Sequence, residues 1–105
     1  MEKMRLVVLV DIPHETRHQR KVEREFNEAL YKAGFTLLQQ GVFTRITDGR
    51  QSASIYAQHL CKCRPEFGTV RVFVLTEKQF EESVLLTQNE TPQEIEIGAQ
   101  LDIFL

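Results

Sequence analysis

The sequence has no excess of charge of either sign and no long apolar run. Thirteen Lys and Arg residues stand against 15 Asp and Glu residues, so the net charge is only −2. This total gives no indication of nucleic-acid binding, which only the distribution of the charges could reveal. No signal-peptide pattern is visible, and the longest apolar run is far short of the ~20 residues that a membrane span needs. We therefore expect a cytoplasmic protein that does not associate with a membrane.

The sequence also has few cysteines and no glycine-rich binding loop. Cys61 and Cys63 are too close together to form a disulfide readily, and one pair is not a disulfide framework. A metal site would need a second ligand pair, which the three histidines do not supply at a recognisable spacing. We expect reduced thiols on a helix. Without a glycine-rich loop, a small-molecule regulatory module ranks below the other functions considered.

What the sequence does contain is an alternation of strand-like and helix-like segments within the length of one domain. Apolar runs and spacing predict strands over residues 5–12, 35–40, 41–46 and 69–75, and helices over residues 15–33 and 49–64. A short helical turn over residues 77–82 and a short strand over residues 84–87 follow. The order β-α-β-β-α-β is that of a ferredoxin-like α+β sandwich, in which two helices cover one face of a four-stranded sheet. We expect this domain to occupy residues 1–87 and a tail to occupy residues 88–105.

The two predicted helices each have a candidate buried face and a candidate end. In the first, Val22, Phe26 and Leu30 follow the spacing of one buried stripe, and Gly34 is a stop signal. In the second, Asp48 can cap the N-terminus. Its inner face would consist of Ile55, Tyr56, His59, Leu60 and Cys63.

The first and fourth strands predict a homodimer. The runs Leu6–Val10 and Val70–Leu75 do not alternate, so both faces of these strands should be buried. Because the helices cover only one face, a second copy packed face to face is the simplest cover for the other. The tail is expected to add a strand or to dock on a partner through Leu101, Ile103 and Phe104, since apolar residues at a free end would otherwise be exposed.

The first predicted helix carries a row of basic residues. Arg17, Arg20, Lys21 and Arg24 follow the i, i+3, i+4, i+7 spacing of one stripe, nearly opposite the apolar stripe. A solvated face usually mixes charges of both signs, and here Glu23 and Glu25 lie on the flanks. The pattern leaves two alternatives open, a solvated face and a face that tracks phosphates.

Asp11 ends the most apolar predicted strand, and two roles are open for its carboxylate. It can serve as a turn acceptor, because Asp-Ile-Pro leads into a helix. In a dimer whose two-fold axis passes near the strand ends, the two Asp11 carboxylates could instead face each other and share a cation. Magnesium accepts few protein carboxylates and keeps several waters, so such a site would suit phosphodiester hydrolysis.

Taken together, several segments resemble the CRISPR-associated protein Cas-two family. They are MRLVVLVDIP at residues 4–13, ETRHQRK at 15–21, GFTLLQQGVFTRI at 34–46 and GTVRVFVLTEKQFE at 68–81. The apolar tail is similar to that of variants from type II systems. One departure is Gly41, where the family often has a serine.

The resemblance implies a ferredoxin-like homodimer in which a late strand crosses to the partner's sheet. It also implies a scaffold that binds a double-stranded DNA prespacer and bridges dimers of the Cas-one integrase during spacer acquisition. Other type II CRISPR proteins are further candidate partners. The alternative that the family offers is a magnesium-dependent endonuclease acting on RNA or DNA, with Asp11 as the metal residue.

Overall fold

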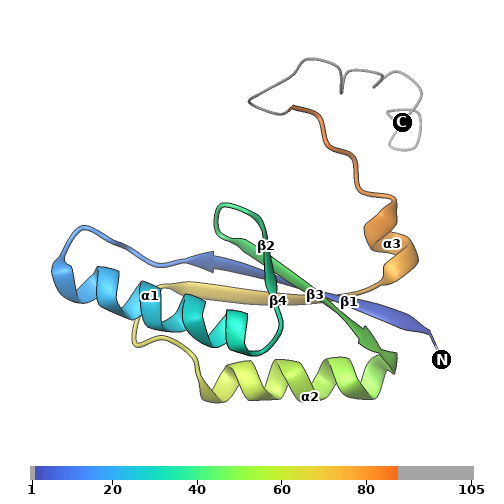
Figure 1. Ribbon diagram of the computed structural model, residues 1–105, viewed down its shortest axis with the longest axis horizontal. Coiled ribbons are helices and arrows are strands. Elements are labelled where there is room, and N and C mark those ends of the chain that lie inside the picture. Colours follow the sequence, from blue (N-terminus) through green and yellow to red (C-terminus); the bar gives the residue numbers. More distant parts are fainter. Residues whose placement is uncertain (1, 88–105) are drawn as a thin grey trace.

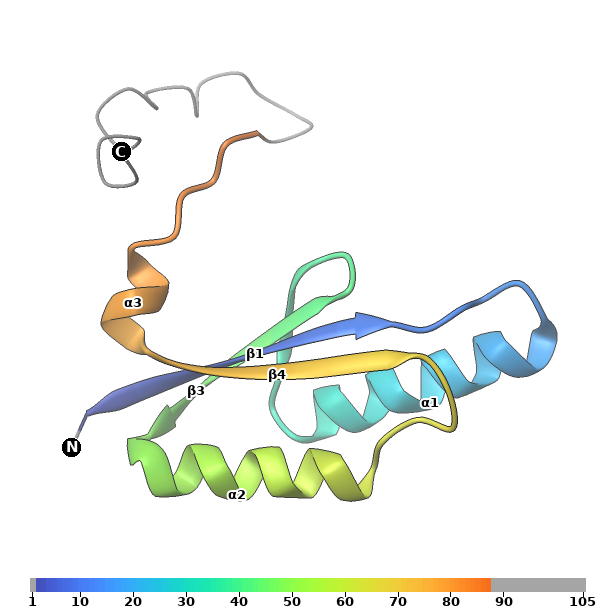
Figure 2. The same cartoon turned by 180° about the vertical axis from the view of Figure 1, so that it is seen from behind.

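The computed structural model describes residues 2–87 and confirms the predicted order of elements. The elements are β1 (Lys3–Asp11), α1 (Arg17–Lys32), β2 (Thr36–Gln39), β3 (Val42–Asp48), α2 (Gly49–Lys62), β4 (Thr69–Thr76) and α3 (Glu77–Glu81). The four strands form one antiparallel sheet in the order β2-β3-β1-β4. Helices α1 and α2 lie on the same side of this sheet (Figure 1; Figure 2). The fold is therefore the predicted ferredoxin-like α+β sandwich.

The core lies between the sheet and the two long helices. From β1, Met4, Leu6 and Val8 point into it and are fully buried. They meet the predicted stripe of α1, where Val22, Phe26 and Leu30 are the buried residues. Phe35, Phe43, Ala53 and Leu60 complete the cluster with Ile12. Burial of this apolar area is the main stabilising term of the fold.

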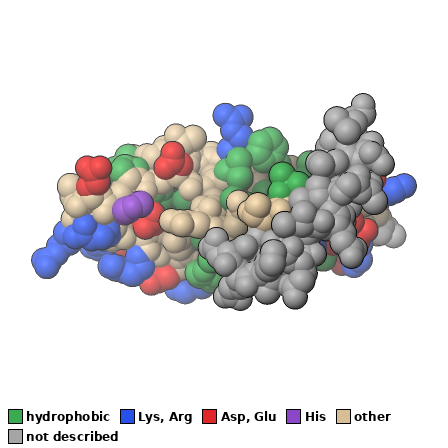
Figure 3. Space-filling view, turned by 90° about the horizontal axis from the view of Figure 1, so that it is seen from above, with side chains coloured by type: hydrophobic (Ala, Val, Ile, Leu, Met, Phe, Trp, Pro, Cys, Tyr) green, Lys and Arg blue, Asp and Glu red, His purple; other side chains and the backbone are tan. Residues whose placement is uncertain are grey.

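The other side of the sheet carries apolar residues that the described part of the chain leaves partly exposed. Val7 of β1 lies opposite Thr44 of β3 and Phe73 of β4. Leu9, Ile46 and Phe73 are 37%, 42% and 43% exposed. Apolar side chains are visible on this side in Figure 3. We call this surface, formed by Val7, Leu9, Val42, Ile46, Phe73 and Leu75, the open face.

Within one chain, the helices cover only the side of Leu6 and Val8, and Leu9 and Phe73 on the other side are exposed. The predicted burial of β1 and β4 on both faces depends on a second copy of the chain, so it stays a prediction. The predicted strand over residues 84–87 is wrong: residues 83–87 have no regular structure in a single chain. A strand needs a neighbour to accept and donate its backbone hydrogen bonds, and no described strand pairs with this segment.

Helix α1 begins two residues after its predicted start because Thr16 is its N-cap. The Thr16 hydroxyl accepts a hydrogen bond from the backbone N–H of Gln19, and the Gln19 side chain accepts one from the backbone of Thr16. This reciprocal capping box satisfies donors that a helix end otherwise leaves unpaired. Gly34 follows the helix with a φ of +86°, as its predicted role as a stop requires.

Helix α2 contradicts two predictions. Asp48 occupies the N-cap position, but its side chain makes no capping hydrogen bond and instead pairs with Lys3 of the adjacent strand. The hydrogen bond and charge of Lys3 lower the pKa of the Asp48 carboxyl. Leu60 is buried as predicted and Tyr56 packs against the core, but Ile55, His59 and Cys63 are exposed. Ala53, a small residue that the apolar pattern passed over, is buried instead.

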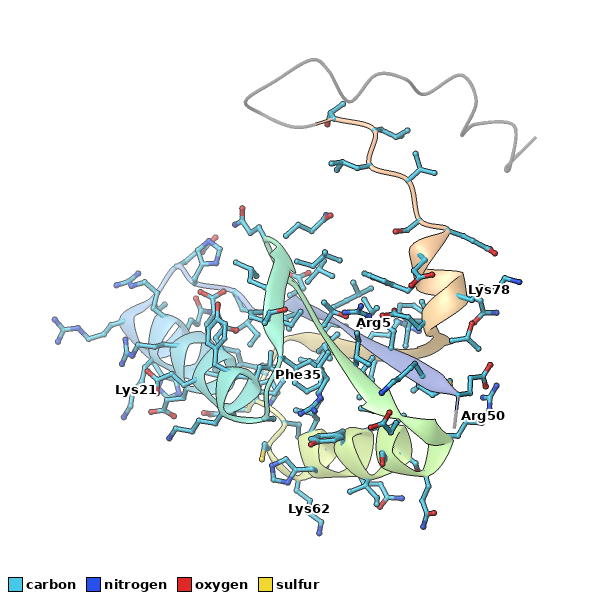
Figure 4. The ribbon with its side chains drawn as sticks, turned by 45° about the vertical axis from the view of Figure 1, so that its right-hand side comes forward. Arg5, Lys21, Phe35, Arg50, Lys62 and Lys78 are labelled. Atoms are coloured by element: carbon cyan, nitrogen blue, oxygen red, sulfur yellow. The ribbon has the colours of Figure 1, made fainter. Side chains whose placement is uncertain are left out.

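Short helix α3 confirms the predicted turn and is attached to the open face by one arginine. Arg5 of β1 donates two hydrogen bonds to the carboxylate of Glu77, at 2.9 and 2.7 Å. Its guanidinium also lies 4.2 Å from the ring centroid of Phe80. Arg5 lies beside this helix in Figure 4. None of the helices in the described part of the chain is long and apolar enough to cross a membrane.

Candidate metal and nucleic-acid sites

Asp11 lies at the end of β1, where two glycines approach the strand's backbone closely. Gly41 precedes β3 and Gly68 precedes β4, and both have the positive φ that glycine adopts without strain. A Cβ on Gly41 would come within 2.9 Å of the Val10 carbonyl oxygen, and one on Gly68 within 2.7 Å of the Asp11 carbonyl oxygen. Glycine at position 41 therefore has a physical reason, since any side chain there would press on the strand that carries Asp11.

The Asp11 side chain is exposed and lines two hollows. The smaller, of about 260 Å³, is bordered by Leu9 of the open face and by Thr69 and Arg71 of β4. The larger, of about 570 Å³, lies on the side of α1. Asp11 thus stands at a rim between the open face and the helix-covered side. Arg71, which the sequence pattern alone did not place, shares the smaller hollow with it.

A single chain does not gather a metal-binding cluster around Asp11. Among residues 2–87, no group of three or more His, Cys, Asp and Glu side chains is arranged to hold an ion. Magnesium binds through one or two carboxylates and keeps several waters, so Asp11 alone supplies one protein ligand. The Asp11 carboxylate of a second copy of the chain would complete the predicted pair of metal ligands. This arrangement stays a prediction.

The four predicted phosphate-binding residues are all exposed on α1. Two of them have partners: Arg20 donates hydrogen bonds to the carbonyl oxygens of His14 and Glu15, at 3.3 and 2.9 Å, and Lys21 lies 3.9 Å from Glu25. Arg17 and Arg24 form no ion pair with any residue in the described range. Lys and Arg side chains gather at the end of the molecule where α1 begins (Figure 3). The four basic side chains therefore lie on one exposed surface of α1. Arg20 also stabilises the loop before α1 through its two hydrogen bonds.

Sequence reasoning missed four residues of the larger hollow. Glu23, Asn27 and Tyr31 project from one face of α1, and His14 follows β1. The Nδ1 atom of His14 lies 3.5 Å from the Glu23 carboxylate. The i, i+4, i+8 spacing of Glu23, Asn27 and Tyr31 was a usable signal, because residues four apart share a helix face. The hollow depends on how α1 packs against β1, which spacing alone does not give.

The partner-docking residues Leu101, Ile103 and Phe104 lie outside the described residues. Cys61 and Cys63 are exposed free cysteines on and just after α2. The Cys63 sulfur lies 4.0 Å from Nε2 of His59.

The fold and these surfaces define a ferredoxin-like domain with an open apolar face, a basic helix and a carboxylate at a strand end. Comparison with known proteins supplies the family, although no family model matches the chain. A CRISPR-associated endoribonuclease Cas2 of Ligilactobacillus salivarius is 34% identical over 79 residues, which are 75% of this chain and 78% of that protein. One of Acidovorax ebreus is 33% identical over 102 residues, 96% of this chain and all of that protein.

A third relative, the CRISPR-associated endoribonuclease Cas2 of Campylobacter jejuni, is 35% identical over 83 residues, which are 79% of this chain. The match spans only 58% of the length of that relative. Two of the three relatives are matched over three quarters or more of their own length as well as of this chain. The chain belongs to the Cas2 family.

Proposed function

We propose that this chain is a CRISPR adaptation scaffold, a homodimer that binds double-stranded DNA and bridges dimers of the Cas-one integrase during spacer acquisition. The observation that carries the proposal is the exposed basic stripe on α1, whose cations face away from the core. Such a surface can neutralise backbone phosphates without reading sequence, as a scaffold for varied DNA requires. Membership of the Cas2 family supports the CRISPR role.

The open face supports the dimeric part of the proposal. Apolar side chains of three strands lie together on it, and they would be buried if a second copy packed against the same surface. A two-fold arrangement of this kind uses the same patch twice. It would also double the number of basic stripes available to one duplex.

The test is a salt titration of duplex binding with a matched control. Arg17→Ala/Arg24→Ala removes the two arginines of the stripe that form no ion pair in the described part of the chain, so the loop contact of Arg20 is kept. Arg50→Ala/Lys78→Ala removes the same charge elsewhere; Figure 4 shows Arg50 and Lys78 at the opposite end of the molecule from Lys21. We expect only the first variant to bind weakly and to flatten the salt dependence, by about 0.9 in slope per lost phosphate contact.

The proposal fails if both variants keep the affinity and salt slope of the parent chain, because the stripe would then be a solvated face. Equal losses in both variants would also contradict it, since they would indicate a response to net charge alone. Co-purification with the integrase, with and without a short duplex, tests the bridging step separately.

A second candidate function is a magnesium-dependent endonuclease acting on RNA or DNA. It is favoured by the position of Asp11, which stands at the rim of the face that a second copy would cover. Two such carboxylates could share one ion, which would polarise a phosphodiester and activate water. The names of the relatives describe those proteins as endoribonucleases. We expect magnesium-dependent cleavage to be lost in Asp11→Asn, and cleavage that survives this change would rule out the Asp11 mechanism.

A further inference from the structure

The larger hollow beside Asp11 has the size and composition of a small-molecule site. Its volume of about 570 Å³ falls in the range of about 300–1,000 Å³ that is typical of such sites. It lies where the end of β1, helix α1 and the β2–β3 hairpin meet (Figure 1). The apolar part of its lining comes from Val10, Ile12, Leu37 and Phe43, with the half-exposed ring of Tyr31 at one side. An aromatic side chain of this kind can stack against a flat ring.

The carboxylates of the lining are hydrogen-bond acceptors, and the amides of Asn27 and Gln40 offer both donors and acceptors. Asp11 and Glu23 bring carboxylates, and the side-chain oxygen of Asn27 is buried without a hydrogen-bond partner in the described part of the chain. The Nδ1 atom of His14 lies 3.5 Å from the Glu23 carboxylate. A ligand that suits these walls must therefore bring N–H donors, because a phosphate would be repelled by the two carboxylates.

The arrangement does not suit a metal ion in place of such a ligand. Asp11, His14 and Glu23 line the same hollow but do not converge as a set of three ligands. Acceptors spread around an apolar floor fit a flat, donor-bearing ring better than they fit a single cation.

We propose that this hollow binds an unpaired nucleobase that carries an amino group: adenine, cytosine or guanine. The ring packs against the apolar floor and Tyr31, and its amino group donates to Asn27 or Glu23. Uracil and thymine lack the amino group, and their N3–H donor is flanked by two carbonyl oxygens that the same acceptors repel. This site goes beyond duplex scaffolding, because a base must be unpaired to present its amino group to the protein. It would read bases at a single-stranded end or segment.

The experiment measures the binding of labelled hexauridine and of hexauridine with one central adenine, cytosine or guanine. Fluorescence anisotropy is recorded on the full chain with a chelator present, so that no cleavage intervenes. We expect at least one amino-bearing base to tighten binding by about tenfold over uridine, the effect of one good hydrogen bond. At least one of Glu23→Gln and Asn27→Leu should lose this ratio, depending on which side chain accepts the amino group. Glu28→Gln, an exposed position on the same helix outside the hollow, should keep it.

Equal binding of all four oligonucleotides overturns the proposal, and so does a base preference that survives both hollow variants. A hollow whose Asn27 side-chain NMR signal responds to protein concentration but not to oligonucleotide is filled by a second copy, which also overturns it. Duplex binding is measured on the same proteins. The scaffold proposal stands if Glu23→Gln leaves the salt slope unchanged, whichever way the base preference falls.

Discussion

The two faces of the sheet are built from alternate residues of the same strands, yet they reach very different states within one chain. On the helix side, Leu6 and Val8 are fully buried. On the other side, Leu9 and Phe73 remain more than one-third exposed. The residue types hardly differ, so hydrophobicity does not decide which face is covered. Helices α1 and α2 complete one face, and the other still offers the apolar area of an interface.

The comparison is sharpest for two phenylalanines on the two strands that flank β1. Phe43 of β3 is 2% exposed on the helix side, and Phe73 of β4 is 43% exposed on the open face. We expect Phe43→Ala to cost about 3–5 kcal/mol of stability, because it removes buried contacts and leaves a cavity. Phe73→Ala should cost about 1 kcal/mol or less in the monomer. Chemical denaturation at low protein concentration measures both values.

Equal losses of stability in Phe43→Ala and Phe73→Ala, at a concentration where the protein is monomeric, would contradict the difference between the two faces. They would mean that the open face is already covered within one chain. A larger loss in Phe73→Ala that appears only as the protein concentration rises would instead support a second copy as the cover.

The second prediction concerns the dimer directly. Phe73→Glu would place a charge in the centre of the proposed interface, where it must lose its hydration. We expect dimer dissociation to become at least about a hundredfold easier, equivalent to about 2.7 kcal/mol. Ile55→Glu is the matched control, because Ile55 is 57% exposed on α2, on the other side of the sheet. Sedimentation equilibrium that shows the same self-association in both variants would exclude the open face as the interface.

The sequence predicted the covered face well because its signals are local. The spacing of Val22, Phe26 and Leu30 on α1 is regular and strongly apolar, and all three are buried. On α2 the pattern is weaker, since its inner residues include small Ala53, and the predicted face wrongly included Ile55 and His59. Small buried residues give little contrast in a helical pattern, so tertiary packing decides the rotation of such a helix.

The candidate sites show the same division between local and long-range information. The basic stripe could be predicted, because helical spacing alone places its members on one face. The role of Asp48 could not, because the β1–β3 register brings Lys3 directly opposite and the carboxylate pairs with it instead of capping α2. The hollow beside Asp11 likewise combines residues far apart in the sequence, such as Asn27 and Gly41. Nothing in either segment by itself indicates that they meet.

The third prediction tests how α3 is attached to the open face. The side chains of Arg5 and Glu77 are only 16% and 18% exposed, and two hydrogen bonds join them. A double-mutant cycle with Arg5→Met and Glu77→Gln should give a coupling of about 1–2 kcal/mol, between the values of exposed and buried ion pairs. Stability of the four proteins is measured by urea denaturation. Additive losses with no coupling would show that α3 is held by Phe80 and its neighbours rather than by the ion pair.

The smallest expected effect is that of the exposed pair Lys3–Asp48 at the N-terminal end of β1. Lys3 lowers the pKa of Asp48 in the folded chain below the ordinary value of 3.8. The stabilising contribution is therefore complete above that ordinary value and is lost as the pH falls through the lower folded-state pKa. Asp48→Asn should lower the melting temperature slightly at neutral pH, and the difference should shrink on acidification below pH 3.8 and in high salt. Asparagine keeps the ability to cap α2, so a difference that is constant across the whole pH range would contradict the ion pair as its cause.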